Sequence, residues 1–454
     1  MLSKIVNNRS AILALIFFIS KGISFLVLPV YSRLLSPEVY GQIESVMTIV
    51  NVAVIFGVFQ LDTSIQRFYY EDTKIKEQSI LLIIVLTLIV SCILYILSDV
   101  LLAYFNVSTE YGYILSIGVF LINLHNIILI CTRFDKDIFG FSVICFMQIL
   151  LSTLFSVTFI SYSGNPIELF LIGQLLGYLI SILFVLINRK YVHSFTFDRQ
   201  VITSALRFSI PQFPARVMTI FNTYLSRVFL AGLVLPSMFG IYSMSLKLSL
   251  VVQIIISGFG FIWWPYIYKN TKLDIVKPKI KKAYFFVSLF VLVATFSTSE
   301  IVIPLLHIML GGEYHESIHY FLGLTISLLF LILHEVTSVG PKVSNKTSYI
   351  TYSYLLSFIF SVVATYPMIS YFGLDGAVFV SLCASVLIVL SSSFYLNKSI
   401  KLKINYYQML LTLSFGVFIY INSYLDLLNI FGLLVLLLLS LSILWFLENY
   451  TKKS

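Results

Sequence analysis

The chain alternates long apolar runs with short polar connections from one end to the other. Runs of about twenty apolar residues recur along it, and about twenty residues are the length that a helix needs to cross the hydrocarbon core of a membrane. The pattern therefore predicts an all-α membrane protein with no soluble domain of any size. We expect about 14 transmembrane helices, at residues 11–33, 38–62, 79–98, 112–131, 138–160, 166–187, 207–233, 237–264, 283–305, 317–339, 348–370, 374–396, 407–423 and 428–447.

The cations lie almost wholly on alternate connections. Of the 29 Lys and Arg residues, 24 lie on the side of the two chain ends, and the seven intervening connections contain none. Because connections rich in Lys and Arg stay in the cytoplasm, we expect both termini to be cytoplasmic. The alternation also supports the number of spans, since one missed or invented span would reverse it for the rest of the chain.

The composition excludes several functional classes. Only 11% of the residues are charged, against about 25% in an average soluble domain. The net charge of +9 reflects topology and contact with anionic lipid, so we expect no nucleic-acid partner. The four cysteines have unrelated spacings, and no histidine in a span has a His or Cys three or four residues on, so we predict neither a disulfide nor a metal site. The chain lacks a phosphate-binding glycine loop and a nucleophile motif, so we predict no enzyme and no cofactor.

Five cations lie outside the topological pattern, in or at the ends of spans: Lys21, Arg33, Arg216, Arg227 and Lys247. A Lys or Arg at the centre of a transmembrane helix costs about 2.5–3.5 kcal/mol on insertion scales, so such residues usually face a cavity or a carboxylate. Arg216 and Arg227 are eleven residues apart, which is near three helical turns, so both project from one face, roughly 16 Å apart. We interpret the five as substrate-binding residues of a water-filled cavity that admits an anion.

Other interpretations of these cations stay open. The side chains of Arg33 and Arg227 would reach the lipid headgroups if they extended along the helix toward the membrane surface. Lys21 and Lys247 lie deeper, where each would form a buried ion pair with Glu44, Glu300 or Glu335.

A short repeat divides the chain into halves. The segments YSRLLSPEVYGQIE (31–44) and LSRVFLAGLVLPSMFGIYS (225–243) each contain Ser-Arg, a spacer and Pro-x-x-aromatic-Gly. The two copies are six spans apart and so have the same membrane orientation, as in carriers built from two parallel six-helix lobes. We predict an N-terminal lobe at 1–197 and a C-terminal lobe at 198–397 around a central cavity, with an extra helical hairpin at 398–454.

Prolines interrupt the two spans that hold four of the five cations. Pro29 lies in the first span, and Pro211 and Pro214 lie in the seventh. Proline removes a hydrogen bond from the helix and bends it, so these positions are either static kinks or hinges of a gate.

Three stretches resemble one family. RLLSPEVYGQIE (33–44), LDTSIQRFYYED (61–72) and residues 208–268, which begin FSIPQFPARVMTIF, are similar to bacterial O-antigen and capsular polysaccharide flippases. These are polysaccharide exporters of the multidrug/oligosaccharidyl-lipid/polysaccharide superfamily. Many relatives carry Asp-Arg in span 7, whereas this chain has Ser226-Arg227, which removes a carboxylate and leaves the cation.

The resemblance implies a function. The cargo would be an undecaprenyl-diphosphate-linked oligosaccharide, moved from the inner to the outer leaflet of the bacterial inner membrane by alternating access. The polymerase and the chain-length regulator of the same pathway would be its protein partners, beside the lipid bilayer. Relatives in the superfamily use proton or sodium gradients, which require an acid, and the candidates are Glu44, Asp62, Glu300 and Glu335.

Three other functions stay open. An antiporter for small organic cations belongs to the same superfamily, but it would need an acidic cavity. A peptidoglycan-precursor flippase shares the fold. A membrane enzyme of the pathway would typically have a long, basic outer loop, whereas the longest outer connection here, at about 99–111, has no Lys or Arg.

Overall fold

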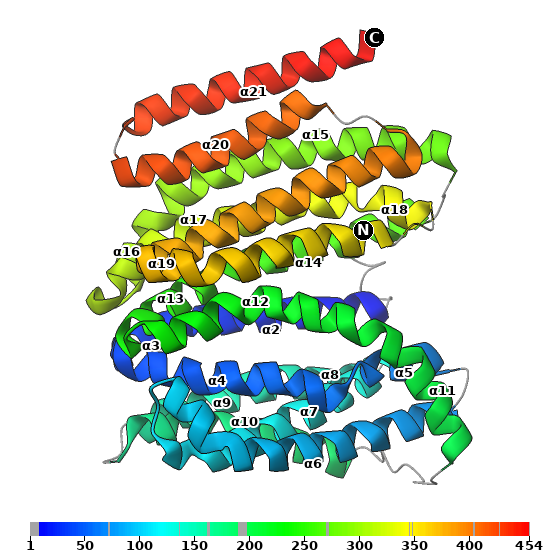
Figure 1. Ribbon diagram of the computed structural model, residues 1–454, viewed down its shortest axis with the longest axis vertical. Coiled ribbons are helices and arrows are strands. Elements are labelled where there is room, and N and C mark those ends of the chain that lie inside the picture. Colours follow the sequence, from blue (N-terminus) through cyan, green and yellow to red (C-terminus); the bar gives the residue numbers. More distant parts are fainter. Residues whose placement is uncertain are drawn as a thin grey trace. The chain divides into compact units, whose positions relative to one another are not determined.

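A computed structural model describes residues 9–70, 73–135, 137–160, 164–188, 198–268, 272–344, 346, 348–402, 405–425 and 427–453. Within these ranges the regular structure is helical and no strand occurs (Figure 1). The segment 189–197, which ends at the predicted lobe boundary, lies outside the described residues, as do the topological cations Lys4, Lys136, Arg189, Lys190, Lys269 and Lys403.

The helices follow one another in a single series. The α-helices are α2 (Arg9–Leu26), α3 (Leu28–Leu34), α4 (Pro37–Val58), α5 (Leu61–Phe68), α6 (Thr73–Tyr104), α7 (Gly112–Phe134), α8 (Ile138–Ser142), α9 (Gln148–Ile160), α10 (Pro166–Asn188), α11 (Arg199–Ser209), α12 (Phe213–Leu233), α13 (Pro236–Ser249), α14 (Val251–Tyr268), α15 (Leu273–Ser297), α16 (Ile303–Met309), α17 (His315–Thr337), α18 (Val339–Val343), α19 (Ser348–Ile400), α20 (Tyr406–Leu425) and α21 (Ile430–Lys453). Short 3₁₀ turns are η1 (Thr109–Tyr111), η3 (Ile210–Gln212) and η5 (Gly312–Tyr314), and π turns are η2 (Val143–Met147) and η4 (Thr298–Val302).

Every predicted span coincides with a helix or a broken helix, so the predicted fold class is confirmed. Within the described part of the chain, nine helical stretches are long and apolar enough to cross a membrane. One of them, α19, contains two predicted spans. Its chain turns at Gly373, whose φ of 58° is open to glycine because glycine has no Cβ.

The predicted interruptions of spans 1 and 7 are confirmed as helix starts. Helix α2 ends at Leu26, and α3 begins at Leu28 with Pro29 in its first turn. The turn η3 precedes α12, which begins at Phe213 with Pro214 in its first turn. Proline fits these positions because the first turn of a helix needs no backbone N–H donor. Whether the breaks move during transport stays a prediction.

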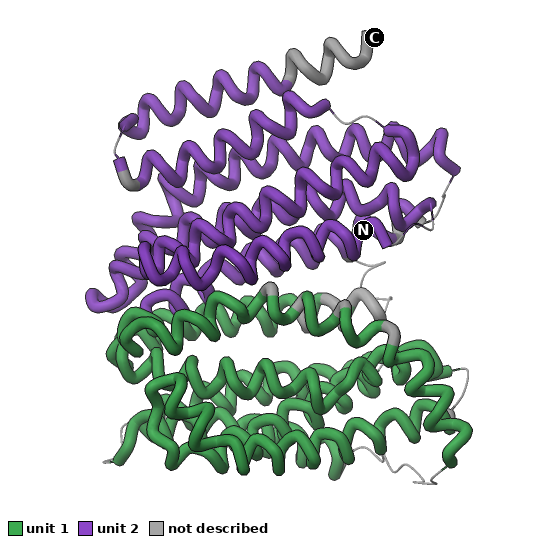
Figure 2. The backbone as a smooth tube through the Cα atoms, in the orientation of Figure 1, with its two compact units in different colours: residues 1–240 green, residues 241–454 purple. Residues whose placement is uncertain are grey.

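Two compact units divide the chain, residues 1–240 and residues 241–454 (Figure 2). In the first unit, one apolar core joins α7, α8 and α10 through Leu121, Phe141 and Ile182. A second core joins α5, α6 and α7, and α11 adds Ala205 to it. The second core thus attaches α11 to the first unit. The lobes at 1–197 and 198–397 stay a prediction.

Helix α17 is the most buried long helix of the second unit, and α14, α15, α19 and α20 pack around it. Hydroxyl groups connect it to its neighbours. The Thr337 Oγ1 and Ser392 Oγ atoms are 2.7 Å apart, and Ser245 Oγ donates to the carbonyl oxygen of Ser317 at 2.7 Å. Small hydroxyl residues allow membrane helices to approach closely while their polar groups stay satisfied.

The two copies of the repeat contact each other within the first unit. Pro37 begins α4 and Pro236 begins α13, so each motif starts a helix, and the aromatic residue of each motif is fully buried. A methyl group added at Gly41 would overlap the carbonyl oxygen of Pro236, and one added at Gly240 would overlap that of Pro37. The contact is therefore reciprocal, and both glycines are required by the close approach of two backbones.

We predict that Gly41→Ala and Gly240→Ala each lower stability by about 1–3 kcal/mol, the usual cost of overpacking. The melting temperature of the purified protein in detergent measures the effect. Gly22→Ala is the matched control, because Gly22 is also helical and has no atom within 4 Å of an added methyl group. Melting temperatures equal to that of the control would contradict the close contact.

Candidate functional site

The site is built around a buried ion pair between α4 and α12. Arg227 Nη1 lies 3.9 Å from Glu44 Oε2, and the two residues are only 8% and 2% exposed. Two unit charges about 4 Å apart attract by roughly 4 kcal/mol in a medium of effective dielectric constant 20. Removing each ion from water costs several kcal/mol. The pair therefore contributes little net stability, which leaves its presence to be explained by another role.

The guanidinium of Arg227 keeps binding capacity beyond Glu44. At 3.9 Å, the closest approach to the carboxylate is longer than a hydrogen bond. The Tyr224 ring lies 5.3 Å from the guanidinium carbon, at cation–π distance. Arg227 Nε is buried, and among the described residues it has no hydrogen-bond partner. Such a group suits an oxyanion, because guanidinium presents several donors in a fixed planar fork.

Polar side chains extend from this pair into the first unit. Tyr40, the aromatic residue of the first repeat, lies within electrostatic reach of Glu44, Arg227 and Tyr31. Gln174 Nε2 donates to Tyr31 Oη at 3.3 Å and to Ser156 Oγ at 3.1 Å. These groups connect α3, α4, α9 and α10 through polar contacts. Tyr31, Tyr40 and Gln174 were absent from our predicted site, although the position of Tyr40 in the repeat was a usable signal.

A second cation on α12 lies beside an acid at the other end of the helix. Phe59 and Gln60 adopt left-handed backbone conformations and turn the chain from α4 into α5, which puts Asp62 in the first turn of α5. Asp62 lies within electrostatic reach of the guanidinium of Arg216. The stacked rings of Phe59 and Phe213, with centroids 4.2 Å apart, attach the two segments.

The remaining predicted cations lie on three different helices. Lys21 is an exposed residue of α2, within electrostatic reach of His125 on α7. Arg33 is exposed on α3. Lys247 is half-buried on α13, in the second unit. The first unit therefore holds Lys21, Arg33, Arg216 and Arg227, and two of them lie beside acids.

The other two acids lie in the second unit. Glu300 is in the π turn η4 and accepts a hydrogen bond of 2.7 Å from Ser299 Oγ. Glu335 lies near Lys342, whose Nζ atom is 3.4 Å from the ring centroid of Trp264. In the described part of the chain, no three His, Cys, Asp or Glu side chains come together as ligands of a metal ion would.

The sequence assigns the family. Residues 7–271 match the family described as "Polysaccharide biosynthesis protein", which covers more than half of the chain. The chain belongs to this polysaccharide biosynthesis family. The family resemblance inferred from the three stretches is thereby confirmed, and it covers α4, α12 and the ion pair between them.

Solved structures support the same fold for this family member. The lipid II flippase MurJ in an inward closed conformation has a TM-score of 0.65 at 14% identity, covering 95% of this chain and 97% of that chain. An inward-facing multidrug resistance MATE transporter of the MOP superfamily has a TM-score of 0.63 at 14% identity, covering 86% and 99%. A MOP superfamily transporter from Pyrococcus furiosus has a TM-score of 0.55 at 14% identity, covering 87% and 98%. No curated protein matches the chain by sequence. The fold is that of a multi-pass membrane transporter.

We predict strong coupling between Glu44 and Arg227 in a double-mutant cycle. Glu44→Gln and Arg227→Gln should each destabilise the protein by about 3–5 kcal/mol, because each leaves an uncompensated buried charge. The double variant should be more stable than either single variant, as measured by the melting temperature in detergent. Glu300→Gln is the control, since Glu300 is only half-buried. Additive losses in the double variant would contradict a direct interaction.

Proposed function

We propose that this protein flips an undecaprenyl-diphosphate-linked oligosaccharide, the repeat unit of an O-antigen or capsule, from the inner to the outer leaflet of the bacterial inner membrane. One observation carries the proposal. In this member of a polysaccharide biosynthesis family, Arg227 is buried 3.9 Å from Glu44, and its Nε has no hydrogen-bond partner among the described residues. A membrane protein tolerates such a cation where it serves a negatively charged cargo.

The chemistry of this cargo fits the cations. Its diphosphate needs fixed positive charges, because it must leave the water of the headgroup region to cross the membrane. Guanidinium groups bind phosphate oxygens through two parallel hydrogen bonds, and Lys adds a compact charge. We propose that Lys21, Arg33, Arg216, Arg227 and Lys247 bind the cargo in a hydrated central cavity, while its polyprenyl tail stays in the lipid. Tyr31 and Tyr40, which are buried near this ion pair, would position the site.

Glu44 would act as the resting counterion of Arg227. In this mechanism the incoming diphosphate replaces the Glu44 carboxylate as the partner of Arg227, and the ion pair between Glu44 and Arg227 forms again when the cargo leaves. The charged and titratable groups around Glu44 are Tyr40 on its own helix, Tyr31 on α3, and Arg227 and Tyr224 on α12. The exchange avoids leaving the buried cation without a partner, which is the expensive state.

The same exchange argues against Glu44 as the acid that couples export to a proton gradient. A proton on Glu44 weakens its hold on Arg227 and so favours the bound cargo. Proton and cargo would then move in the same direction, and an inward proton gradient would oppose export. We therefore propose that an ion gradient, if it drives transport, acts through another of the candidate acids, Asp62, Glu300 or Glu335.

A diphosphate-binding measurement tests the role of Glu44. We predict that Glu44→Gln binds inorganic diphosphate about tenfold more tightly than the parent protein, because the competing carboxylate is gone. The rise in melting temperature with added diphosphate measures binding, since a ligand of the folded state stabilises it by mass action. Glu300→Gln should match the parent protein. Equal or weaker binding by Glu44→Gln would refute the exchange.

Gene deletion tests the function itself. We predict that the deletion strain loses one surface glycan and accumulates its lipid-linked unit in the inner leaflet. In that strain, Arg216→Ala and Lys247→Ala should restore export about tenfold less well than the parent gene, the cost of one charge-assisted contact. Protein abundance in the membrane is measured beside export. Lys281→Ala, which removes an exposed cation on α15, is the control. Normal export by both variants at normal abundance would refute the cavity assignment.

A peptidoglycan-precursor flippase is the second candidate, favoured by the fold shared with lipid II flippase MurJ. The same deletion strain separates the two. Loss of a surface glycan with intact growth supports the oligosaccharide cargo, whereas lysis with accumulation of the peptidoglycan precursor supports the second candidate.

A further inference from the structure

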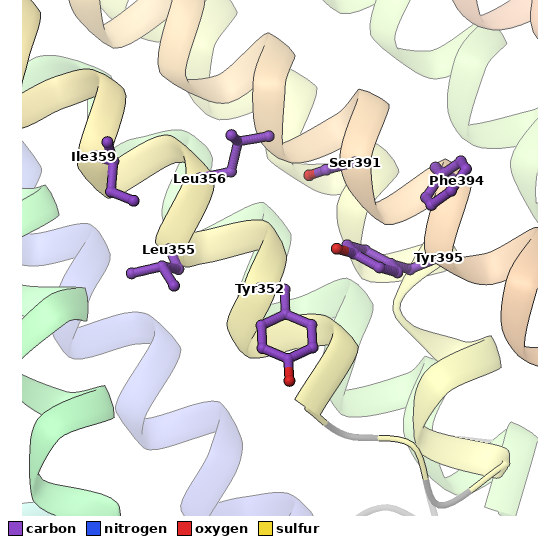
Figure 3. A pocket seen from close by; sticks show the side chains of 7 residues that line it. All are labelled: Tyr352, Leu355, Leu356, Ile359, Ser391, Phe394 and Tyr395. Atoms are coloured by element: carbon purple, nitrogen blue, oxygen red, sulfur yellow. The ribbon is translucent and has the colours of Figure 1, made fainter.

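A lateral groove of about 460 Å³ lies in the second unit, between the two halves of α19 (Figure 3). This volume falls in the range of about 300–1,000 Å³ that is usual for small-molecule sites. The groove is lined by Tyr352, Leu355, Leu356 and Ile359 from the first half and by Ser391, Phe394 and Tyr395 from the second.

The walls of the groove are apolar along most of its length. Leu356, Ile359 and Phe394 are 47%, 52% and 57% exposed, so about half of the surface of each is not covered by the described residues. The one aliphatic hydroxyl group in the lining, that of Ser391, donates to carbonyl groups of its own helix and is already satisfied. A hydrocarbon chain can therefore lie against the walls without leaving the Ser391 hydroxyl group without a hydrogen bond.

One end of the groove is polar and positively charged. The rings of Tyr395 and Tyr349 stack with centroids 4.8 Å apart, and Lys398 Nζ lies 5.4 Å from the Tyr349 centroid. Tyr352 lies beside Tyr395, with ring centroids 6.2 Å apart. Tyrosine rings and Lys at one end of a membrane helix are typical of the headgroup region. The predicted topology puts this end on the cytoplasmic side.

The cation at one end of the groove favours a lipid as its occupant. From Tyr352 to Ile359 the helix advances by about 10 Å, which is about a third of the roughly 30 Å hydrocarbon core. Exposed apolar residues continue along α19 at Val362 and Val363, so an acyl chain that leaves the groove still lies on an apolar surface. A lipid of one leaflet can therefore fill the groove with the first part of its chain while its headgroup lies beside the cation.

We propose that the groove binds an anionic phospholipid of the cytoplasmic leaflet, separately from the transported cargo. One acyl chain lies along Leu356 and Ile359, and the phosphate lies beside Lys398. The charge of Lys398 selects an anionic headgroup over a zwitterionic one, since each Lys near a membrane surface contributes attraction for anionic lipid. The tyrosines contact the glycerol region between chain and headgroup.

Native mass spectrometry of the purified full-length protein tests the proposal by titration with phosphatidylglycerol, phosphatidylcholine and undecaprenyl phosphate. We predict one tight phosphatidylglycerol per chain. Lys398→Gln should weaken its binding about fivefold without affecting phosphatidylcholine. Ser391→Leu, which fills the groove, should weaken both phospholipids. Lys281→Gln is the control, because it removes an exposed Lys of α15 away from the groove.

Each other outcome overturns the proposal. Equal phosphatidylglycerol binding by the parent protein and both groove variants would show that the groove is not the site. If Lys281→Gln weakened phosphatidylglycerol binding as much as Lys398→Gln does, the weakening would come from the lower net charge and not from the groove. Tighter binding of undecaprenyl phosphate that is lost in Ser391→Leu would make the groove a site for the cargo chain. Melting temperatures of the variants near that of the parent protein show that each one folds.

Discussion

The candidate site depends on one constraint, the burial of the charged Arg227 side chain inside a membrane protein. Arg227 is buried near the carboxylate of Glu44, which lies too far away for a hydrogen bond, and the Tyr224 ring lies nearby. Charge attraction and the loss of hydration nearly balance in such a pair, so it holds the cation without satisfying it. A fully satisfied guanidinium would have no donor left for a diphosphate, and an isolated one would be too costly to bury. The intermediate arrangement suits a site that must bind and release.

The positions of helices were predictable because membrane insertion imposes simple length and polarity rules. Apolar runs located the spans, and Pro29 and Pro214 marked the breaks because proline cannot continue a helix. The pairing of Glu44 with Arg227 was not predictable in the same way. It depends on the rotation of two helices far apart in sequence, which no periodicity of either helix alone determines. The sequence leaves Lys21 and Lys247 open as partners of Glu44, whereas the structure pairs Glu44 with Arg227.

Side-chain chemistry also limits what spacing alone reveals. Arg216 and Arg227 were expected on one face of their helix, and the structure puts acids beside both, Asp62 and Glu44. Sequence spacing grouped the cations but gave no information about their counterions, and their role as a set stays a prediction. The polar residues around the pair, Tyr31 and Gln174, have ordinary spacings in apolar helices, so only the folded chain brings them to the site.

The contact between Gly41 and Gly240 constrains how this protein can evolve. An added methyl group at each glycine would meet the main chain of the opposite repeat first, so the contact is made by backbone and not by adjustable side chains. A larger residue at either glycine would push apart the starts of α4 and α13. Because the contact is made by backbone atoms, a smaller side chain elsewhere would not restore the space. The two positions are therefore coupled, because a side chain added at either one has to be accommodated by the backbones of both helices.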